Sequence, residues 1–254
     1  MKIDRILRRW RDELTEIALA TIYPIECRVC GRMVEARADG IACAECWLAI
    51  DGARDRATPC PKCGWGLIPA RRAIAVDRQC GECPQFLFSQ ARSIGPHTGA
   101  LRQSVVWLKR YPQLAPRLQR MLASTWATLP EPGRFDLVLP IPLHARRLAA
   151  RKFNQAELIG RIIAGFSGCP LETIGLIRIR ETERHRHGQG LSERARSLRQ
   201  AFAVSAPRLI AGRRILLVDD VLTTGATASE CARILHLHGA STVTVAVLAR
   251  AVRH

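Results

Sequence analysis

The chain has 254 residues, 48% of them hydrophobic and 24% charged, which is the composition of a globular protein rather than of a disordered or collagen-like chain. Its formal net charge is +17 and most of its 39 basic residues are arginine, so candidate partners include nucleic acids, phosphorylated metabolites and anionic membrane surfaces. A GC-rich genome would produce the same arginine excess, so charge alone does not choose among these partners.

The first predicted element is an N-terminal amphipathic helix in residues 1–26. Its apolar residues recur at intervals of three or four: Leu7, Trp10, Leu14 and Ile17. Docking on the rest of the protein and binding at a membrane surface are both open for such a helix. The sequence has no apolar window of about 18 residues and no signal-peptide core, so we expect no membrane span and a cytoplasmic location.

Residues 27–88 are predicted to form a small zinc module. Eight cysteines form four CxxC pairs there: Cys27/Cys30, Cys43/Cys46, Cys60/Cys63 and Cys80/Cys83. Each CxxC turn directs two thiolates toward one tetrahedral metal, and two turns complete a four-sulfur site. We therefore expect two structural zinc ions. The segment lacks the apolar periodicity of a core, so metal binding is expected to supply its folding free energy.

Other uses of paired cysteines fit less well. Disulfides are rare in a chain that is not secreted, and a thioredoxin-like redox motif occurs once beside a βαβ unit rather than four times in a row. Iron–sulfur clusters use different spacings. Cys169 and Cys231 lie outside the pairs and are expected to be small buried apolar residues.

The remainder, residues 89–254, is predicted to be an α/β domain with a parallel sheet, because apolar β-rich runs alternate with helical patterns from about residue 86 onward. The expected strands are Phe86–Ile94, Phe135–Ile141, Leu176–Ile179, Arg214–Asp219 and Thr242–Leu248. The expected helices are Gly99–Lys109, Leu114–Thr125, Asn154–Phe166 and Thr227–His238, the last ended by Gly239.

A basic block follows the second of these strands. Arg146, Arg147 and Arg151 come after Ile141, where a loop at the carboxyl end of a strand could hold a pyrophosphate group. A solvated, basic helix start explains the same charges and stays open.

The most informative stretch is residues 213–230, RRILLVDDVLTTGATASE. An apolar strand leads into Asp219 and Asp220, which we expect at its exposed end, and then into a short loop and a helix. The N-terminus of a helix offers free N–H groups and a positive dipole end to an anion. The loop adds the hydroxyls of Thr223, Thr224 and Thr227, and Gly225 permits close approach of a phosphate.

Carboxylates placed before such a loop are suited to accept hydrogen bonds from ribose hydroxyls, so the stretch is predicted to bind a ribose 5-phosphate. An ordinary strand–helix turn with a threonine cap is the simpler alternative. A Walker phosphate loop is excluded because the GK[ST] sequence is missing.

The sequence VDDVLTTGAT, residues 218–227, resembles the signature with which type I phosphoribosyltransferases bind 5-phosphoribosyl-1-pyrophosphate (PRPP). The resemblance implies a phosphoribosyltransferase-like parallel sheet with helices on both faces, and Mg²⁺ bound together with PRPP. It assigns PRPP binding to Asp219, Asp220, Val221, Thr223, Thr224, Gly225, Ala226 and Thr227.

Four CxxC pairs followed by this domain resemble the ComF family of competence-associated proteins from about Cys27 to Arg250. Further matching blocks are LVLPIPLH at 137–144, RKFNQAELIG at 151–160 and RIRET at 178–182. The resemblance implies a double zinc ribbon and a pyrophosphate loop at the basic block. Lys152 replaces the usual glycine of the family, so a strained backbone is not expected there.

Two functions are compatible with this resemblance. The chain is either an enzyme that transfers phosphoribose to a nitrogen acceptor with release of pyrophosphate, or a non-catalytic PRPP-binding module. In the second case it handles single-stranded DNA in natural transformation, with DNA-uptake proteins as partners. No residue of the sequence is identified as catalytic.

Overall fold

The computed structural model describes residues 24–55, 58–64, 66–67, 86–127, 135–181 and 197–251. The predicted N-terminal helix lies outside these residues, as do Cys80 and Cys83. The helices within the described ranges are all too short or too polar to cross a lipid bilayer.

Four parallel strands form the central sheet. Their order across the sheet is β3 (Gln90–Pro96), β8 (Thr242–Arg250), β7 (Arg214–Leu222) and β4 (Leu137–Pro140). Each corresponds to a predicted strand, although β3 begins later than expected and β7 continues beyond Asp219. The extension of β7 arises from its pairing with β8, which aligns Val221 with Ala249. All carboxyl ends of these strands therefore lie at one edge of the sheet.

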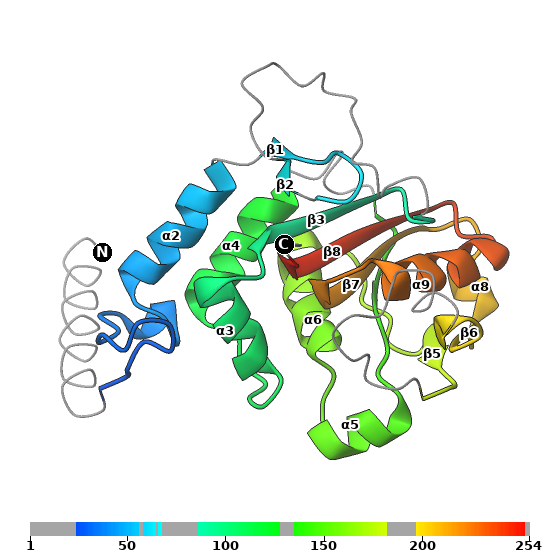
Figure 1. Cartoon of the computed structure of the whole chain (residues 1–254). Helices are drawn as coiled ribbons and strands as arrows, with labels where there is room; N and C mark the ends of the chain where they lie inside the picture. The colour runs from blue at the N-terminus through cyan, green and yellow to red at the C-terminus, as the bar shows by residue number, and fades with distance from the viewer. Residues whose placement is uncertain are drawn as a thin grey trace, which may run out of the picture.

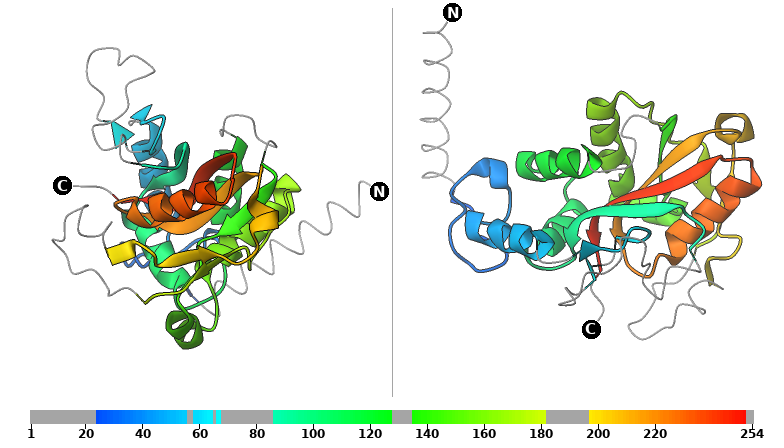
Figure 2. Two further views of the ribbon diagram at one scale, coloured as in Figure 1. Left: turned by 90° about the vertical axis from the view of Figure 1, so that its right-hand side faces the viewer. Right: turned by 90° about the horizontal axis from the view of Figure 1, so that it is seen from above.

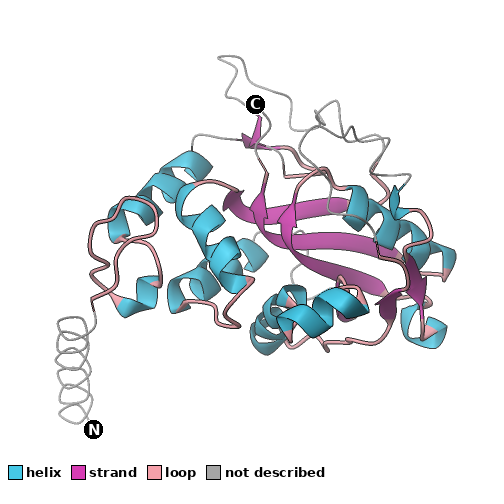
Figure 3. Cartoon of the chain, turned by 60° about the horizontal axis from the view of Figure 1, so that its bottom comes forward, coloured by secondary structure: helices cyan, strands magenta, loops and turns pink. Residues whose placement is uncertain are grey.

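Helices cover both faces of the sheet, as predicted (Figures 1 and 3). On β7, Ile215 and Leu217 point into one buried cluster while Leu216 and Val218 point into the other, as the two-residue period of a strand requires. The second cluster lies under α3 (Gly99–Leu108), α4 (Pro116–Ala127) and α6 (Gln155–Ser167), and the first under α9 (Ala226–Leu237). Burial of each such aliphatic side chain stabilises the fold by about 1.5–3 kcal/mol.

Smaller elements lie around this core. β5 (Leu176–Arg178) pairs antiparallel with β6 (Phe202–Val204), and α8 (Pro207–Ile210) follows (Figure 2). β1 (Thr58–Pro59) pairs antiparallel with β2 (Gly66–Leu67). The helix α5 (Ala145–Arg151) carries the basic block, which was expected to be a loop.

The cysteine segment has an apolar core, so the expectation that it lacks one is wrong. It contains a short 3₁₀ helix, η1 (Arg37–Asp39), and a helix, α2 (Ala44–Asp55). Trp47 and Ile50 of α2 are buried in the same cluster as Leu101 of α3. Trp47 and Ile50 are three residues apart, as a helix requires, but the prediction for this segment rested only on its cysteine pairs. The metal module and the sheet domain consequently share one core.

Polar contacts tie the two parts together as well. The Trp47 indole Nε1–H donates to the carbonyl oxygen of Asp39 at 3.0 Å. Arg117 of α4 forms ion pairs with Asp39 and Asp51, each at 3.3 Å, and its guanidinium lies over the Trp47 ring. Since Arg117 comes from the sheet domain, it fixes the position of α2 against α4.

Candidate functional site

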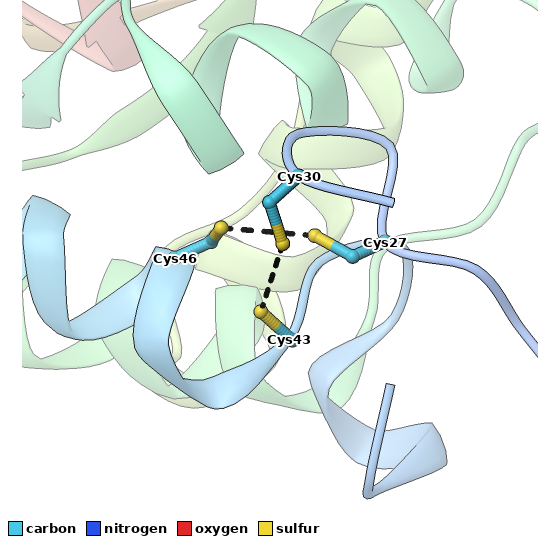
Figure 4. A group of neighbouring side chains, drawn as sticks. All are labelled: Cys27, Cys30, Cys43 and Cys46. Carbon is cyan, nitrogen blue, oxygen red and sulfur yellow. Dashed lines mark hydrogen bonds between the residues drawn. The ribbon is translucent and has the colours of Figure 1, made fainter. Parts of the chain in front are cut away.

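Four cysteines converge at the N-terminal end of the described chain (Figure 4). The Sγ atoms of Cys27, Cys30, Cys43 and Cys46 all lie within 4.8 Å of one another. Two of these separations, Cys27 to Cys46 and Cys30 to Cys43, are 3.7 and 3.6 Å. A tetrahedral zinc ion with Zn–S bonds of about 2.3 Å places its sulfurs about 3.8 Å apart. The first and second CxxC pairs thus form one of the expected four-sulfur sites, and its geometry fits zinc.

Tight turns bring these thiols together, and backbone hydrogen bonds favour the thiolate form that binds a metal ion. The Gly31 N–H donates to the Cys27 carbonyl at 2.8 Å, and Gly31 takes a positive φ of 77° to close the first CxxC turn. Burial raises the pKa of the Cys27 thiol, but hydrogen bonds from the backbone of Cys43, Cys30 and Val29 outweigh it and lower that pKa to about 6. Burial and the neighbouring thiols raise the pKa of Cys46. Four thiolates this close together require the positive charge of a metal ion.

The third CxxC pair lies against the sheet. Cys60 and Cys63 are fully buried, and the Gly64 N–H donates to the Cys60 carbonyl at 2.9 Å. The Lys62 carbonyl accepts a 2.6 Å hydrogen bond from the Ala91 N–H, at the start of β3. The fourth pair, Cys80 and Cys83, lies outside the described residues, so the second zinc site stays a prediction.

Asp219 and Asp220 lie inside β7 and are half-buried, so the expectation of an exposed strand end is wrong. The physical reason is the continued pairing of β7 with β8, which aligns Asp219 with Val247. Burial, and then repulsion from Asp220, raises the pKa of Asp219 to about 8. A carboxylate pair in this position is stabilised by a bound cation or by hydroxyl donors from a ligand.

The loop after β7 leads directly into the N-terminus of α9. The hydroxyls of Thr223 and Thr227 make no hydrogen bond within the part of the chain that the structure describes, whereas Thr224 Oγ1 accepts from the Ala226 N–H at 3.4 Å. The first turn of α9 contains no acidic residue, so its positive end is not neutralised. These donors surround the position where the sequence predicts a phosphate.

Gly225 is required at the entrance to α9. Its φ is +79°, and a Cβ atom at this position would lie 2.7 Å from Cε1 of Phe86. Phe86 in turn stacks on Phe88 in the core, so it cannot move aside cheaply. The geometry therefore requires a glycine here for packing against Phe86, while the predicted close approach of a phosphate stays a prediction.

Three residues that sequence reasoning assigned no role converge on this loop and its carboxylates. Arg250, at the end of β8, is buried and donates to the carbonyl oxygens of Leu222, at 2.6 Å, and Thr223, which fixes the start of the loop. Lys109 Nζ lies 3.5 Å from the Asp220 carboxylate. Burial and then the charge of Lys109 lower the pKa of His97.

The arginines of the basic block lie on α5 and face different ways. Arg146 is largely exposed and forms an ion pair with Glu181 at 2.8 Å, which fits the solvated alternative. Arg147 and Arg151 are half-buried. The structure therefore separates Arg146 from the two other predicted pyrophosphate residues.

Arg178, at the end of β5, connects α5 with the carboxylates. Its guanidinium lies 5.3 Å from the centroid of the Phe202 ring. Burial, and then the nearby charge of Arg147, lower the pKa of Arg178, while Asp219 is close enough to oppose them. The charges of Arg147, Arg178 and Asp219 are thus near enough to act on one another.

Comparison with known proteins agrees with this geometry. The phosphoribosyl transferase domain model matches residues 108–253. The DNA utilization protein YhgH of Salmonella typhimurium is 33% identical over 236 residues, which cover 88% of this chain and 96% of that protein. The competence protein ComFC of Bacillus subtilis is 27% identical over 186 residues, covering 69% of this chain and 70% of its own. The chain belongs to the ComF family.

Competence protein F of Haemophilus influenzae, another relative, is 32% identical over 117 residues, or 46% of this chain and 51% of its own. Among solved structures, glutamine phosphoribosylpyrophosphate amidotransferase from B. subtilis aligns with 51% of this chain and 25% of its own, at 23% identity and a TM-score of 0.35. The match to the ComF relatives extends over both the cysteine segment and the sheet domain, because it covers most of the chain.

Lys152 replaces the glycine of the ComF pattern, but its backbone has the left-handed conformation that glycine favours. It ends α5 with a φ of 65°, and its N–H donates to the Leu148 carbonyl at 2.7 Å. The expectation of an unstrained backbone at this position is therefore wrong. The left-handed residue ends α5, two residues before Asn154 caps α6.

Lys152→Gly is expected to raise the free energy of unfolding by about 1 kcal/mol, because glycine adopts a positive φ without the steric cost that lysine has. Ala150→Gly, two residues earlier in right-handed α5, should lower that free energy by about 0.5–1 kcal/mol. Denaturant titration of both variants checks the pair. Destabilisation by Lys152→Gly would show that the lysine side chain matters more than its backbone.

Proposed function

We propose that this ComF protein binds PRPP together with Mg²⁺ at the carboxyl edge of its sheet. The observation that carries the proposal is the half-buried pair Asp219 and Asp220, followed by two unengaged threonine hydroxyls and the start of α9. The carboxylates accept hydrogen bonds from the ribose hydroxyls, and the loop and helix N-terminus bind the 5-phosphate. Asp219 and Asp220 would also be available to hold Mg²⁺, which would supply positive charge to the leaving pyrophosphate.

Arg147 and Arg178 are the cations that we assign to the pyrophosphate group. Both are half-buried, and the charge of Asp219 acts on Arg178, which relates them to the ribose part of the proposed site. Arginine binds phosphate oxygens bidentately, which positions the leaving group as well as stabilising it. Arg146 contributes less because Glu181 already neutralises it.

The corresponding reaction is transfer of phosphoribose to a nitrogen acceptor. A bond forms between C1 of the ribose and the acceptor nitrogen while the C1–oxygen bond breaks. Pyrophosphate leaves with the bonding electron pair, and the nitrogen gives up a proton. Electrostatic stabilisation of the departing pyrophosphate is the main contribution that the arginines make.

A non-catalytic PRPP-binding module that serves DNA handling is the second candidate. It is favoured by the relatives, which are named DNA utilization protein and competence protein and are matched over as much as 96% of their length. Both candidate functions include two structural zinc ions, one of them in the Cys27–Cys46 cluster.

Incubation with Mg²⁺, PRPP and each common nucleobase separates the two candidates. The enzyme proposal predicts release of one pyrophosphate per transferred phosphoribosyl group with at least one acceptor. PRPP binding in a parallel calorimetric titration, without turnover on any acceptor, supports the module instead. Absence of PRPP binding contradicts both.

A further inference from the structure

Next to the PRPP site, three side chains form a stack where the cysteine module meets the end of α3. The rings of Trp107 and Tyr111 are stacked with their centroids 4.0 Å apart. The guanidinium carbon of Arg28 lies 4.5 Å from the centroid of the Trp107 ring. Two groups at these distances cannot occupy the same face of one indole, so Trp107 lies between Arg28 and Tyr111. We refer to Arg28, Trp107 and Tyr111 as the aromatic stack.

The backbone holds this stack in place. Trp107 and Tyr111 are four residues apart, and the N–H groups of Arg110 and Tyr111 both donate to the Trp107 carbonyl, at 2.9 and 3.0 Å. Arg28 lies inside the first CxxC turn, and its own N–H donates to the Ile41 carbonyl at 2.9 Å. The geometry of the cysteine cluster therefore positions Arg28, while α3 and the turn that follows it position Trp107 and Tyr111.

Packing does not explain the outer layer of the stack. Only 5% of the residues of this chain are aromatic, and rings such as Trp47, Phe88 and Trp126 are buried in the core. Tyr111 by contrast is 48% exposed, although it lies against a second aromatic ring. A large flat ring that is ordered and yet open to solvent is suited to receive another flat group.

The charges around the stack select the kind of partner. Arg28, which lies over Trp107, and Arg110, next to Tyr111, are exposed, in a chain with a net charge of +17. Sites for single-stranded nucleic acid combine cations that contact the phosphates with aromatic rings on which bases stack. A peptide or lipid surface would not need the flat, cation-backed ring that this site presents.

We propose that the aromatic stack is a platform for single-stranded DNA, on which an unpaired base stacks against the exposed ring of Tyr111. Arg28 and Arg110 contact the adjacent phosphates. Lys109, two residues before Tyr111, is the residue that pairs with Asp220, so a strand on the platform passes beside the candidate PRPP site. The platform does not depend on PRPP and is testable without it.

Binding of a labelled thymidine oligonucleotide of about 15 nucleotides is the direct test, with an abasic strand of equal length as the probe that keeps the charge and lacks the bases. Wild-type protein should bind the thymidine strand more tightly. Tyr111→Leu should weaken that binding roughly 5- to 150-fold and leave binding of the abasic strand unchanged. Tyr111→Phe should retain it.

Phe166→Leu is the matched control, because Phe166 is also an exposed ring, 40% accessible, but lies on α6. It should bind both strands as the wild type does. Tyr111→Leu should keep the wild-type affinity for PRPP, which distinguishes loss of the platform from failure of the proposed PRPP site. Equal affinity of the wild type for the two strands, wild-type affinity of Tyr111→Leu for thymidine, or no binding at low salt overturns the proposal.

Discussion

Replacing Asp219 and Asp220 together by asparagine is expected to weaken binding of Mg²⁺-bound PRPP by about 100-fold or more. Each carboxylate accepts a hydrogen bond that is worth about 1.5–3 kcal/mol when one partner is charged, and two such losses correspond to this factor. The amides keep the size of the side chains but cannot bind a cation strongly. Isothermal titration calorimetry with PRPP and Mg²⁺ measures the change.

The single variant Asp219→Asn should be more stable than the wild type although it binds PRPP more weakly. The folded-state pKa of Asp219 is about 8, above its unfolded value, so the folded protein binds more protons in this range and loses stability as the pH rises toward 8. An asparagine has no charge to desolvate. Asp219→Asn should therefore raise the free energy of unfolding at pH 8 by about 1–2 kcal/mol while weakening PRPP binding.

Asp136→Asn is the matched control at the opposite end of the sheet. Hydrogen bonds from the Arg214 side chain and backbone lower the pKa of Asp136 to about 2. Its stabilising effect is present above the unfolded pKa of about 3.9 and is lost as the pH falls through about 2. At pH 8 this variant should be less stable than the wild type and bind PRPP normally. Normal PRPP binding by the Asp219/Asp220 double variant as well would refute the site assignment.

Loss of the first zinc ion is expected to destabilise the sheet domain as well as the cysteine segment. Cys30→Ser removes one thiolate of the four-sulfur cluster and should lower the zinc content from two ions per chain to one. Trp47 and Ile50 share a core with α3, so the melting temperature of the main transition should fall by roughly 10 °C. Elemental analysis and circular dichroism measure the two effects.

Cys169→Ala is the control for this experiment, because Cys169 is buried far along the chain, near Phe135, and belongs to no CxxC pair. It should keep the full zinc content. A Cys30→Ser protein that retains two zinc ions contradicts the metal assignment. One that loses zinc and melts like the wild type contradicts the shared core.

Local patterns in the sequence were sufficient to predict those parts of the fold that are determined by residues close together in the chain. The strand, loop and helix around Asp219 follow from an apolar run, a glycine and a helical period, and α9 ends at Leu237, next to the predicted last residue, His238. The CxxC spacing likewise predicted that two such turns form a four-sulfur site, because each turn needs only four consecutive residues, but it did not predict which pairs combine.

Contacts between distant segments could not be predicted in this way. Lys109 and Arg250 join the site only because β3, β7 and β8 lie side by side, an arrangement that no local pattern specifies. Arg250 was nevertheless detectable in principle, since a charged residue at the end of a buried strand needs a polar partner. The left-handed Lys152 was missed because a lysine does not normally indicate a positive φ.

The central claim, that the carboxyl edge of this sheet is a PRPP site, is tested most directly by calorimetric titration of the wild-type protein with PRPP in the presence and absence of Mg²⁺. Binding of one PRPP per chain that strengthens with Mg²⁺ and is competed by pyrophosphate is the result that the site geometry predicts. No binding at millimolar PRPP, with Mg²⁺ present and the protein folded and zinc-loaded, would contradict it.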